Sequence, residues 1–305
     1  MIQQSAAERY LAAAALLPPH LRGPAEKLEV FRQNRAEELR LRTGQLMTAV
    51  YPEGERPIPG TEEPVTGRDL ELVLEIATHA SVHTAQSQLS NGFFTVKGGH
   101  RIGVCGSAVV QEGYVRNLRQ FSSLAIRIAR QVPGAAGPVL DKLWQDGRLQ
   151  NTLLVSPPGG GKTTLLRDLI RCISDGDGCP ALRVGVADER GELAAVEGGV
   201  PQLSIGSRTD VMDGCPKDKA LLMLLRGMNP QVLAADEITA PGDCAALELA
   251  ANCGVALLCS AHGVDLEDLR RRPLYQNLLE QKIFQRLVLI RRAGAGRSYQ
   301  VVELC

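Results

Sequence analysis

Apolar and polar residues follow one pattern in the first 130 or so residues and another in the remainder. Near the start, Tyr10–Leu17 (Y-L-A-A-A-A-L-L) has the composition of an amphipathic helix. Glu37–Tyr51 alternates apolar and polar residues around a Thr43-Gly44 turn, as half-exposed strands do. Because helical and strand patterns are mixed here without a regular order, we expect a small α+β domain over residues 1–131.

Turn residues divide the rest of this first domain. Pro52–Gly67 is rich in Pro and Gly, which predicts a loop, and Arg68–Ser81 carries apolar residues at helical spacing. Phe93–Val96 and Arg101–Val110 have the pattern of two strands, and the K-G-G-H turn at 97–100 would join them as a hairpin.

From Asn151 onward, strands are predicted to alternate with helices. Short and nearly continuous apolar runs predict strands at Thr152–Ser156, Arg183–Glu189, Gln231–Glu237, Val255–His262 and Arg286–Arg292. Helical patterns lie between them at Thr163–Ser174, Asp218–Met228, Pro241–Cys253 and Leu266–Ile283. A last strand, Tyr299–Leu304, is expected to pair back through a Gly294-Ala295-Gly296 turn. We therefore expect an α/β domain with a mainly parallel sheet over 151–305, with 132–150 as a linker and helix leading into it.

The first predicted strand of this domain runs into a glycine-rich loop. Ser156–Thr163 (S-P-P-G-G-G-K-T) fits the pattern G-x-x-x-x-G-K-[ST] except that Ser156 replaces the first glycine. Gly159, Gly160 and Gly161 let successive backbone N–H groups turn around a phosphate, at the positive end of the following helix. Lys162 would reach the β- and γ-phosphates, and Thr163 would supply a hydroxyl ligand for Mg²⁺. The neighbouring Pro158 and Thr164 complete the predicted nucleotide-binding segment, and its cofactors are ATP and Mg²⁺.

Acidic and polar side chains are expected at the ends of the neighbouring strands. Asp236 and Glu237 follow an apolar strand, where Asp236 would hold Mg²⁺ and Glu237 would act as the base that orients the attacking water. His262 ends the next predicted strand and would sense the γ-phosphate. Within Asp188-Glu189-Arg190-Gly191-Glu192, Glu189 is the candidate for shaping the Mg²⁺ and water site, although a local salt-bridge cluster is an equal alternative.

A transition-state arginine is expected in an enzyme of this kind, often from another subunit. The candidates are Arg208 in G-S-R-T-D and, in the first domain, Arg127 and Arg130 in I-R-I-A-R. Sequence alone does not rank these three arginines.

Composition narrows the possible partners. The 34 basic and 34 acidic residues give a net charge of zero, and aromatic residues make up 4%. Long nucleic-acid contacts need a basic surplus, and single strands need aromatic stacking platforms, so we expect no nucleic-acid partner. The eight cysteines form no C-x-x-C pair or zinc spacing, and no apolar run is long enough to span a bilayer. We expect a cytoplasmic protein.

Together these segments resemble the stage III sporulation protein AA family of endospore-forming bacteria, which is similar to type II secretion and type IV pilus ATPases. The resemblance is carried by Val96–Gly106, Ser156–Asp168, Val186–Leu193, Gly206–Pro216, Asp236–Ile238 and Ser260–Gly263. Asn117–Arg130 also resembles the arginine-bearing segment that precedes the motor in secretion ATPases.

The resemblance implies a RecA-like ATPase motor that assembles as a homo-oligomeric ring, with a hexamer expected. It would work on the mother-cell side, peripheral to the membrane, with membrane-embedded components of a sporulation channel as partners, and would energise transport or assembly. Three alternatives stay open: a pilus or secretion motor outside sporulation, a nucleotide-gated scaffold without turnover, and a nucleic-acid-dependent ATPase. The last would bind through Lys97, His100, Arg101 and Arg116.

Overall fold

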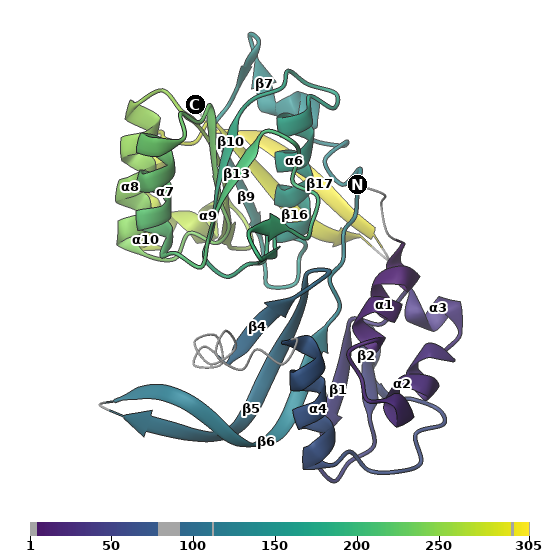
Figure 1. Ribbon diagram of the computed structural model, residues 1–305. Coiled ribbons are helices and arrows are strands. Elements are labelled where there is room, and N and C mark those ends of the chain that lie inside the picture. The colour runs from purple at the N-terminus through teal and green to yellow at the C-terminus, as the bar shows by residue number, and fades with distance from the viewer. Residues whose placement is uncertain (1–4, 79–91, 112, 294–295, 305) are drawn as a thin grey trace. The chain divides into compact units, whose positions relative to one another are not determined.

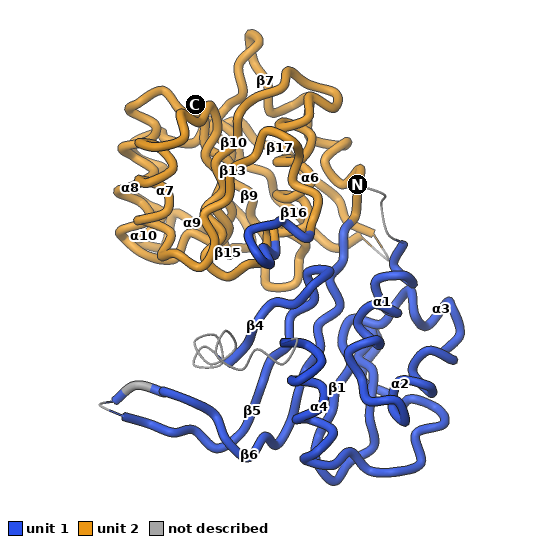
Figure 2. The backbone as a smooth tube through the Cα atoms, in the orientation of Figure 1, with its two compact units in different colours: residues 1–131, 195–202 blue, residues 132–194, 203–305 orange. Residues whose placement is uncertain are grey.

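Two sheets organise the chain, one of six strands and one of seven (Figure 1). The computed structural model describes residues 5–78, 92–111, 113–293 and 296–304. The chain divides into two compact units, and Figure 2 colours them separately. Unit 1 contains residues 1–131 and 195–202, and unit 2 contains 132–194 and 203–305.

The sheet of unit 1 is antiparallel throughout its described pairings, in the order β3-β2-β1-β6-β5-β4. Its strands are β1 (Glu38–Arg42), β2 (Thr48–Tyr51), β3 (Gly54–Pro57), β4 (Phe93–Val96), β5 (His100–Gln111) and β6 (Tyr114–Arg127). Leu39 and Leu41 of β1 are fully buried while their neighbours are partly exposed, so the predicted alternation gives the sheet its core face. The β4–β5 hairpin forms as predicted, but its connection is Lys97–Gly99, because His100 already belongs to β5 and pairs with Val96.

Helices α1 (Ala6–Ala14), α2 (Pro19–Glu26), α3 (Val30–Gln33) and α4 (Gly67–Ala77) complete unit 1. Capping boxes start α1 at Ser5 and Glu8 and α4 at Thr66 and Asp69, because each side chain satisfies a backbone N–H left open by the helix. The helix predicted at Tyr10–Leu17 therefore begins earlier than expected. The end of the helix predicted over 68–81 includes residues 79–81, which lie outside the described residues.

The sheet of unit 2 has the order β13-β10-β14-β15-β9-β16-β17 and is parallel except where β16 meets β17. Its strands are β9 (Thr152–Ser156), β10 (Val184–Asp188), β13 (Thr209–Asp213), β14 (Val232–Ala235), β15 (Ala256–His262), β16 (Arg286–Ala293) and β17 (Gly296–Glu303). Every residue of β9, β10 and β14 is buried, as expected of parallel strands covered on both faces.

Helices lie on both faces of this sheet, with α6 on one side and α7, α8 and α10 on the other (Figure 1). Their bounds are α6 (Lys162–Asp175), α7 (Lys217–Gly227), α8 (Pro241–Asn252), α9 (Leu266–Arg270) and α10 (Pro273–Glu280). A 3₁₀ turn at Leu140–Leu143 and the short pair β7 (Trp144–Gln145) and β8 (Arg148–Leu149) precede β9. The single helix predicted over Leu266–Ile283 is wrong: Pro273, which has no backbone N–H to donate, starts a new helix.

Residues 195–202 differ from the expected division, which placed all of 151–305 in one domain. They form a hairpin of β11 (Val196–Glu197) and β12 (Val200–Pro201), and they group with unit 1. The side-chain oxygen of Gln202 accepts a 2.9 Å hydrogen bond from the backbone N–H of Gly98, and β11 contacts β4. These contacts explain why the hairpin belongs to the first unit.

Candidate active site

The glycine-rich loop follows β9 and leads into α6, in the predicted order of strand, loop and helix. Gly159 and Gly161 have φ of 68° and 103°, a region that residues with a Cβ rarely adopt. Gly160 is needed for a different reason, since a Cβ there would lie 2.2 Å from the buried Oγ of Ser156. The three glycines therefore give the loop its turn and its close fit against the end of the strand.

Lys162 is buried beside this loop, at 4% exposure. Its Nζ donates to the Ser156 carbonyl at 3.2 Å and lies 2.9 Å from Nδ1 of His262. Burial lowers the pKa of Lys162, and the nearby Glu237, Asp236 and Glu192 act in the opposite direction. An anionic phosphate at the loop would add a partner for this ammonium group.

Thr163 and Asp236 place two side-chain oxygen atoms next to each other. The Thr163 hydroxyl donates to Oδ2 of Asp236 at 2.7 Å, and Ser260 donates to Oδ1 of the same carboxylate. A hydroxyl and one carboxylate suit Mg²⁺, which usually binds one or two protein oxygens and takes its other ligands from water and phosphate. Among the described residues no group of three or more His, Cys, Asp or Glu side chains could hold a metal by itself.

Glu237 lies at the centre of the polar contacts at this edge of the sheet. Its Oε1 is 2.8 Å from Nε2 of His262, and its Oε2 accepts from Arg190 at 3.0 Å. Its backbone φ is 50°, which is the left-handed region and is uncommon for a residue other than glycine. The carboxylate is thus held between two donors at a backbone position that is unusual in itself.

His262 connects Glu237 to the loop lysine. A lysine ammonium only donates, so Nδ1 of His262 accepts from Lys162 and the proton of the neutral ring lies on Nε2, where it can donate to Glu237. The three side chains come from the start of α6, the end of β14 and the end of β15. The sheet brings them together because β9, β15 and β14 are neighbours with their carboxyl ends at one edge.

Asp188 is the first residue of the D-E-R-G-E segment; it ends β10 and is 2% exposed. Its carboxylate accepts from the backbone N–H groups of Glu192, Leu193 and Ala194 and so fixes the loop after the strand. Burial raises the pKa of Asp188, while these three donors oppose the shift. Glu189, the candidate from sequence, forms an ion pair with Lys217 at 3.2 Å.

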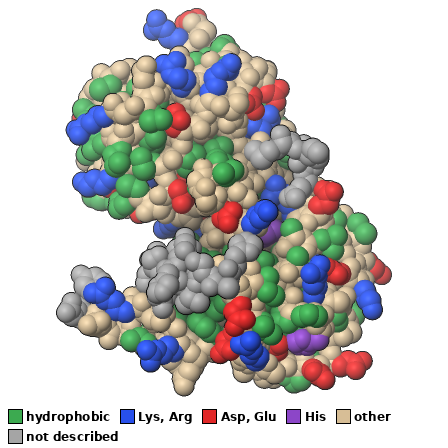
Figure 3. Space-filling model, in the orientation of Figure 1, with side chains coloured by type: hydrophobic (Ala, Val, Ile, Leu, Met, Phe, Trp, Pro, Cys, Tyr) green, Lys and Arg blue, Asp and Glu red, His purple; other side chains and the backbone are tan. Residues whose placement is uncertain are grey.

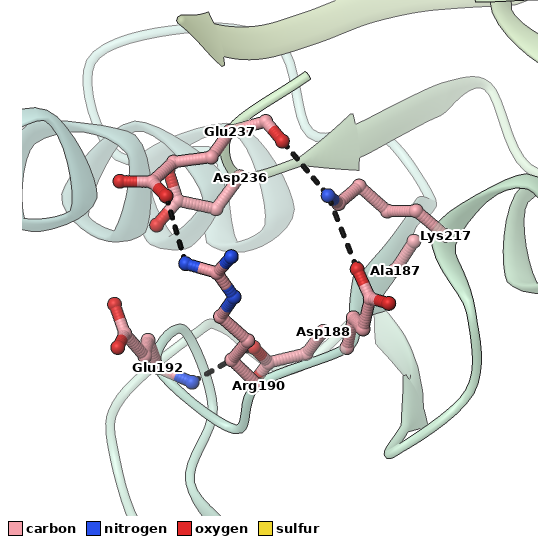
Figure 4. Close-up of a pocket in the computed structure, with 8 residues that line it drawn as sticks. Ala187, Asp188, Arg190, Glu192, Lys217, Asp236 and Glu237 are labelled. Carbon is pink, nitrogen blue, oxygen red and sulfur yellow. Dashed lines mark hydrogen bonds and ion pairs between the residues drawn. The ribbon is translucent and has the colours of Figure 1, made fainter. Parts of the chain in front are cut away.

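A small pocket is lined by acidic residues that lie at the ends of β10 and β14 (Figure 4). Its lining includes Asp188, Glu189, Arg190, Lys217, Asp236 and Glu237. In Figure 4 Arg190 points toward the carboxylates of the Asp236-Glu237 pair, and Lys217 lies against the backbone of Glu237 from the other side. The pocket therefore combines the proposed metal and base residues with two cations.

Two of the basic residues at this site were missed from sequence. Lys217 opens α7 and is 5% exposed. A cation at a helix N-terminus opposes the helix dipole, and this unfavourable placement is a signal that could have marked it. Arg297 of β17 donates from Nε to the Gly160 carbonyl at 2.6 Å, and only the pairing of β17 beside β16 reveals this contact.

The structure does not bring Arg208 to the loop of its own chain. Arg208 donates to Ser174 in the last turn of α6, through its backbone N–H at 2.7 Å and through Nη1 at 3.3 Å. Because α6 has 14 residues, its last turn is roughly 20 Å from the loop at about 1.5 Å per residue. Arg127 and Arg130 belong to unit 1, where Arg127 pairs with Glu38 at 3.6 Å and Arg130 donates to the Ala36 carbonyl.

Solved structures that are similar to this fold include a pilus retraction motor and the ATPase DotB. The pilus retraction motor PilT with bound ADP is similar over 88% of this chain and 79% of that chain, with a TM-score of 0.59 and 17% identity. The ATPase DotB of Yersinia pseudotuberculosis is similar over 88% of this chain and 76% of that chain, with a TM-score of 0.60 and 14% identity. The chain thus has the α/β fold, with a mixed sheet, that these ATPases share.

The sequence identifies the family within that fold. Residues 15–302 match the family described as sporulation stage III, protein AA. Stage III sporulation protein AA of Bacillus subtilis is 41% identical over 240 residues, which is 78% of this chain and 78% of that protein. The chain belongs to the stage III sporulation protein AA family, which confirms the resemblance seen in its motifs. Across the described residues, no helix combines the length and the apolar character that a membrane crossing requires.

Proposed function

We propose that this protein hydrolyses ATP and uses the reaction as a secretion-type motor during sporulation. The observation that carries the proposal is the convergence of Lys162, Thr163, Asp236, Glu237 and His262 on one edge of the unit 2 sheet. A loop that binds phosphate, a pair of magnesium ligands and a carboxylate poised as a base are the parts that phosphoryl transfer to water needs.

Each residue has a distinct role in this proposal. Lys162 and the backbone N–H groups of Gly159–Gly161 bind the phosphates, with Pro158 and Thr164 flanking them. Thr163 and Asp236 hold Mg²⁺, which when bound neutralises charge on the β- and γ-phosphates. Glu237 orients water and accepts its proton, while His262 keeps the carboxylate next to the loop.

Turnover by the purified full-length chain with ATP and Mg²⁺ tests the enzyme assignment. Lys162→Ala should abolish binding or turnover. Glu237→Gln should still bind ATP but lose turnover by about 100-fold or more, the range that a general base contributes. Glu267→Gln is a matched control, because Glu267 is exposed and pairs with Arg271. A Glu237→Gln variant with full turnover would remove the assigned base. ATP binding without any turnover by the unchanged protein would instead favour the nucleotide-gated scaffold.

The motor proposal also includes ring assembly, with a hexamer expected and with Arg127, Arg130 or Arg208 supplied to a neighbouring subunit. If an arginine acts between subunits, turnover per chain should rise with protein concentration, and sizing should show assembly with ATP and Mg²⁺. A flat concentration profile would contradict an arginine supplied in trans. Membrane-embedded components of a channel between mother cell and forespore are the proposed partners of the ring.

Single-stranded DNA and RNA in the same assay test the nucleic-acid alternative. On the face drawn in Figure 3, basic side chains are interspersed with acidic ones instead of forming one continuous basic area. We therefore expect no stimulation. A strong stimulation that falls with added salt would favour a nucleic-acid-dependent ATPase over a secretion motor.

A further inference from the structure

We propose that Lys217 is a positioning residue that holds the Glu237 carboxylate in place for ATP hydrolysis, an inference that rests on the proposed function. Lys217 begins α7 and lies in the pocket beside Glu237 (Figure 4). Among the described residues its hydrogen bond and ion pairs are with Glu237, Glu189 and Asp243, and none of these residues belongs to the phosphate loop. Its effect on the reaction would therefore pass through Glu237.

The first contact is with the backbone of Glu237. Nζ of Lys217 donates to the Glu237 carbonyl oxygen at 2.8 Å. On the other side, Oγ of Ser260 accepts the Glu237 N–H at 2.9 Å, and the following N–H, of Ile238, donates to the Ser260 carbonyl at 2.9 Å. The two peptide groups around Glu237 are thus fixed by side-chain and backbone partners together.

This fixation is needed because of the backbone conformation of Glu237. A φ of 50° is unfavourable for a residue with a side chain, and such a position persists only where its surroundings determine it. In this conformation the carboxylate reaches Nε2 of His262 and Nη1 of Arg190. Without the bond from Lys217, the backbone could relax to a favoured region and turn the carboxylate away from both donors.

The second and third contacts hold Lys217 itself. Nζ lies 3.2 Å from Oε2 of Glu189 and 3.7 Å from Oδ2 of Asp243. Asp243 also accepts the N–H groups of Thr239 and Ala240 at the start of α8, so it is fixed in turn. A buried ammonium group at a helix N-terminus is unfavourable, and the two carboxylates and the carbonyl offset that cost.

A purely structural role for Lys217 makes a different prediction from a positioning role. If Lys217 only stabilises the fold, its loss should weaken nucleotide binding and turnover together. If it positions Glu237, the loop contacts of Lys162 and Thr163 remain intact. In that case kcat should fall while KM for ATP and Kd for ADP stay nearly constant.

Lys217→Met in the full-length chain is the direct test. We expect kcat to fall by roughly 10- to 100-fold, which is less than the loss of about 100-fold or more expected when the base itself is removed, with KM for ATP and Kd for ADP changed by less than about threefold. Lys219→Met is the matched control, because Lys219 lies on the same helix, is 67% exposed and pairs with Asp218. The control should behave as the unchanged protein.

Two further variants keep the test decisive if Lys217→Met folds poorly. Lys217→Arg retains the charge but cannot reproduce the same compact ammonium contacts, so it should show a smaller fall in kcat at unchanged Kd for ADP. In a Glu237→Gln background, Lys217→Arg should have no further effect on residual turnover, because both changes act on one group.

The outcomes separate this inference from the proposed function. If the unchanged protein has no ATPase activity, the proposed function fails. If it is active and both Lys217 variants keep full kcat, only the positioning role is overturned. A parallel loss of ADP binding and turnover in Lys217→Arg, or an additive effect with Glu237→Gln, would also overturn it.

Discussion

Thr163 donates a 2.7 Å hydrogen bond to Asp236, a residue 73 positions further along the chain. The contact joins the first turn of α6 to the end of β14. It places a hydroxyl and a carboxylate oxygen together at the edge where the phosphate loop opens. Magnesium ligands in nucleotide hydrolases are arranged in this way. We therefore expect Mg²⁺ binding to depend on these two side chains.

Thr163→Val removes the hydroxyl ligand and leaves the shape of the residue almost unchanged. We expect the Mg²⁺ concentration for half-maximal ATPase activity to rise by about tenfold or more, as the loss of a metal partner usually does. A Mg²⁺ titration of turnover at fixed ATP measures the shift. An unchanged Mg²⁺ requirement would show that the hydroxyl is not a ligand.

His262→Ala removes the link between Lys162 and Glu237. Lys162 would then keep its hydrogen bond to the Ser156 carbonyl, and Glu237 would keep its hydrogen bond from Arg190. We expect single-turnover hydrolysis to slow by roughly 10- to 100-fold, while ATP binding measured by fluorescence changes little because the loop backbone is intact. His262→Gln, which retains a side-chain N–H donor, should lose less. Equal rates in His262→Ala and the unchanged protein would exclude a role in hydrolysis for the link through His262.

Gly160→Ala should distort the phosphate loop, since its Cβ would lie 2.2 Å from Oγ and 2.6 Å from Cβ of Ser156. Nucleotide affinity should therefore fall, and Ser156→Gly should restore part of it by opening the space. Rescue should be partial because the Pro157 carbonyl remains 3.0 Å away. Kd for ADP in the unchanged protein, the two single variants and the double variant gives the coupling free energy between residues 156 and 160. We expect about 1–3 kcal/mol, as for residues in contact. Additive effects would contradict the close fit.

His100 predicts a pH-dependent stability of unit 1. Its side chain is 1% exposed, its Nδ1 accepts the Ala129 N–H, and burial, followed by the charge of Arg9, lowers its pKa from 6.5 to about 4. Because the folded state binds fewer protons than the unfolded chain, the stability from neutral His100 is complete above pH 6.5. It is lost as the pH falls from 6.5 toward about 4.

Hydrogen exchange in β5 and β6 of the full-length protein measures this effect. The free energy of opening should fall by about 1 kcal/mol between pH 7 and pH 5.5 after correction for intrinsic exchange rates. His100→Gln should be less stable at pH 7, because its flexible amide side chain fits the site of the imidazole ring poorly, but it should lack this pH-dependent loss. An identical pH dependence in both proteins would assign the effect to another group.

The structure brings together the predicted site residues that could each be located in the sequence from one strand and the residues that follow it. Asp236 comes directly after β14, His262 ends β15 and Lys162 follows the glycine loop that leaves β9, and the carboxyl ends of parallel strands share one edge. Lys217 and Arg297 could not be found this way. Their contacts depend on the strand order and on how α7 and β17 pack, which no local pattern contains.

The strands of the fold likewise divide into those that a local apolar pattern predicts and those that only their pairing with other strands reveals. The buried strands β9, β10, β14 and β15 were predicted within a few residues because their apolar runs are continuous. The edge strand β13 was missed, since Thr209–Asp213 is polar and only partly buried. β6 was also missed as a strand: its many polar residues hide the alternation that its pairing with β1 and β5 makes visible.

The small hairpin at residues 195–202 determines how this protein can be divided or recombined. Unit 1 is built from two separate stretches of chain, so the polypeptide passes between the units at 131–132, 194–195 and 202–203. A single cut at residue 131 therefore yields no complete unit: the shorter piece loses Gln202, and the longer piece retains a hairpin without its sheet. Exchange of the first unit between relatives would require joins at all three of these positions. Gene fusion at one junction is therefore a poor route to new combinations of these domains.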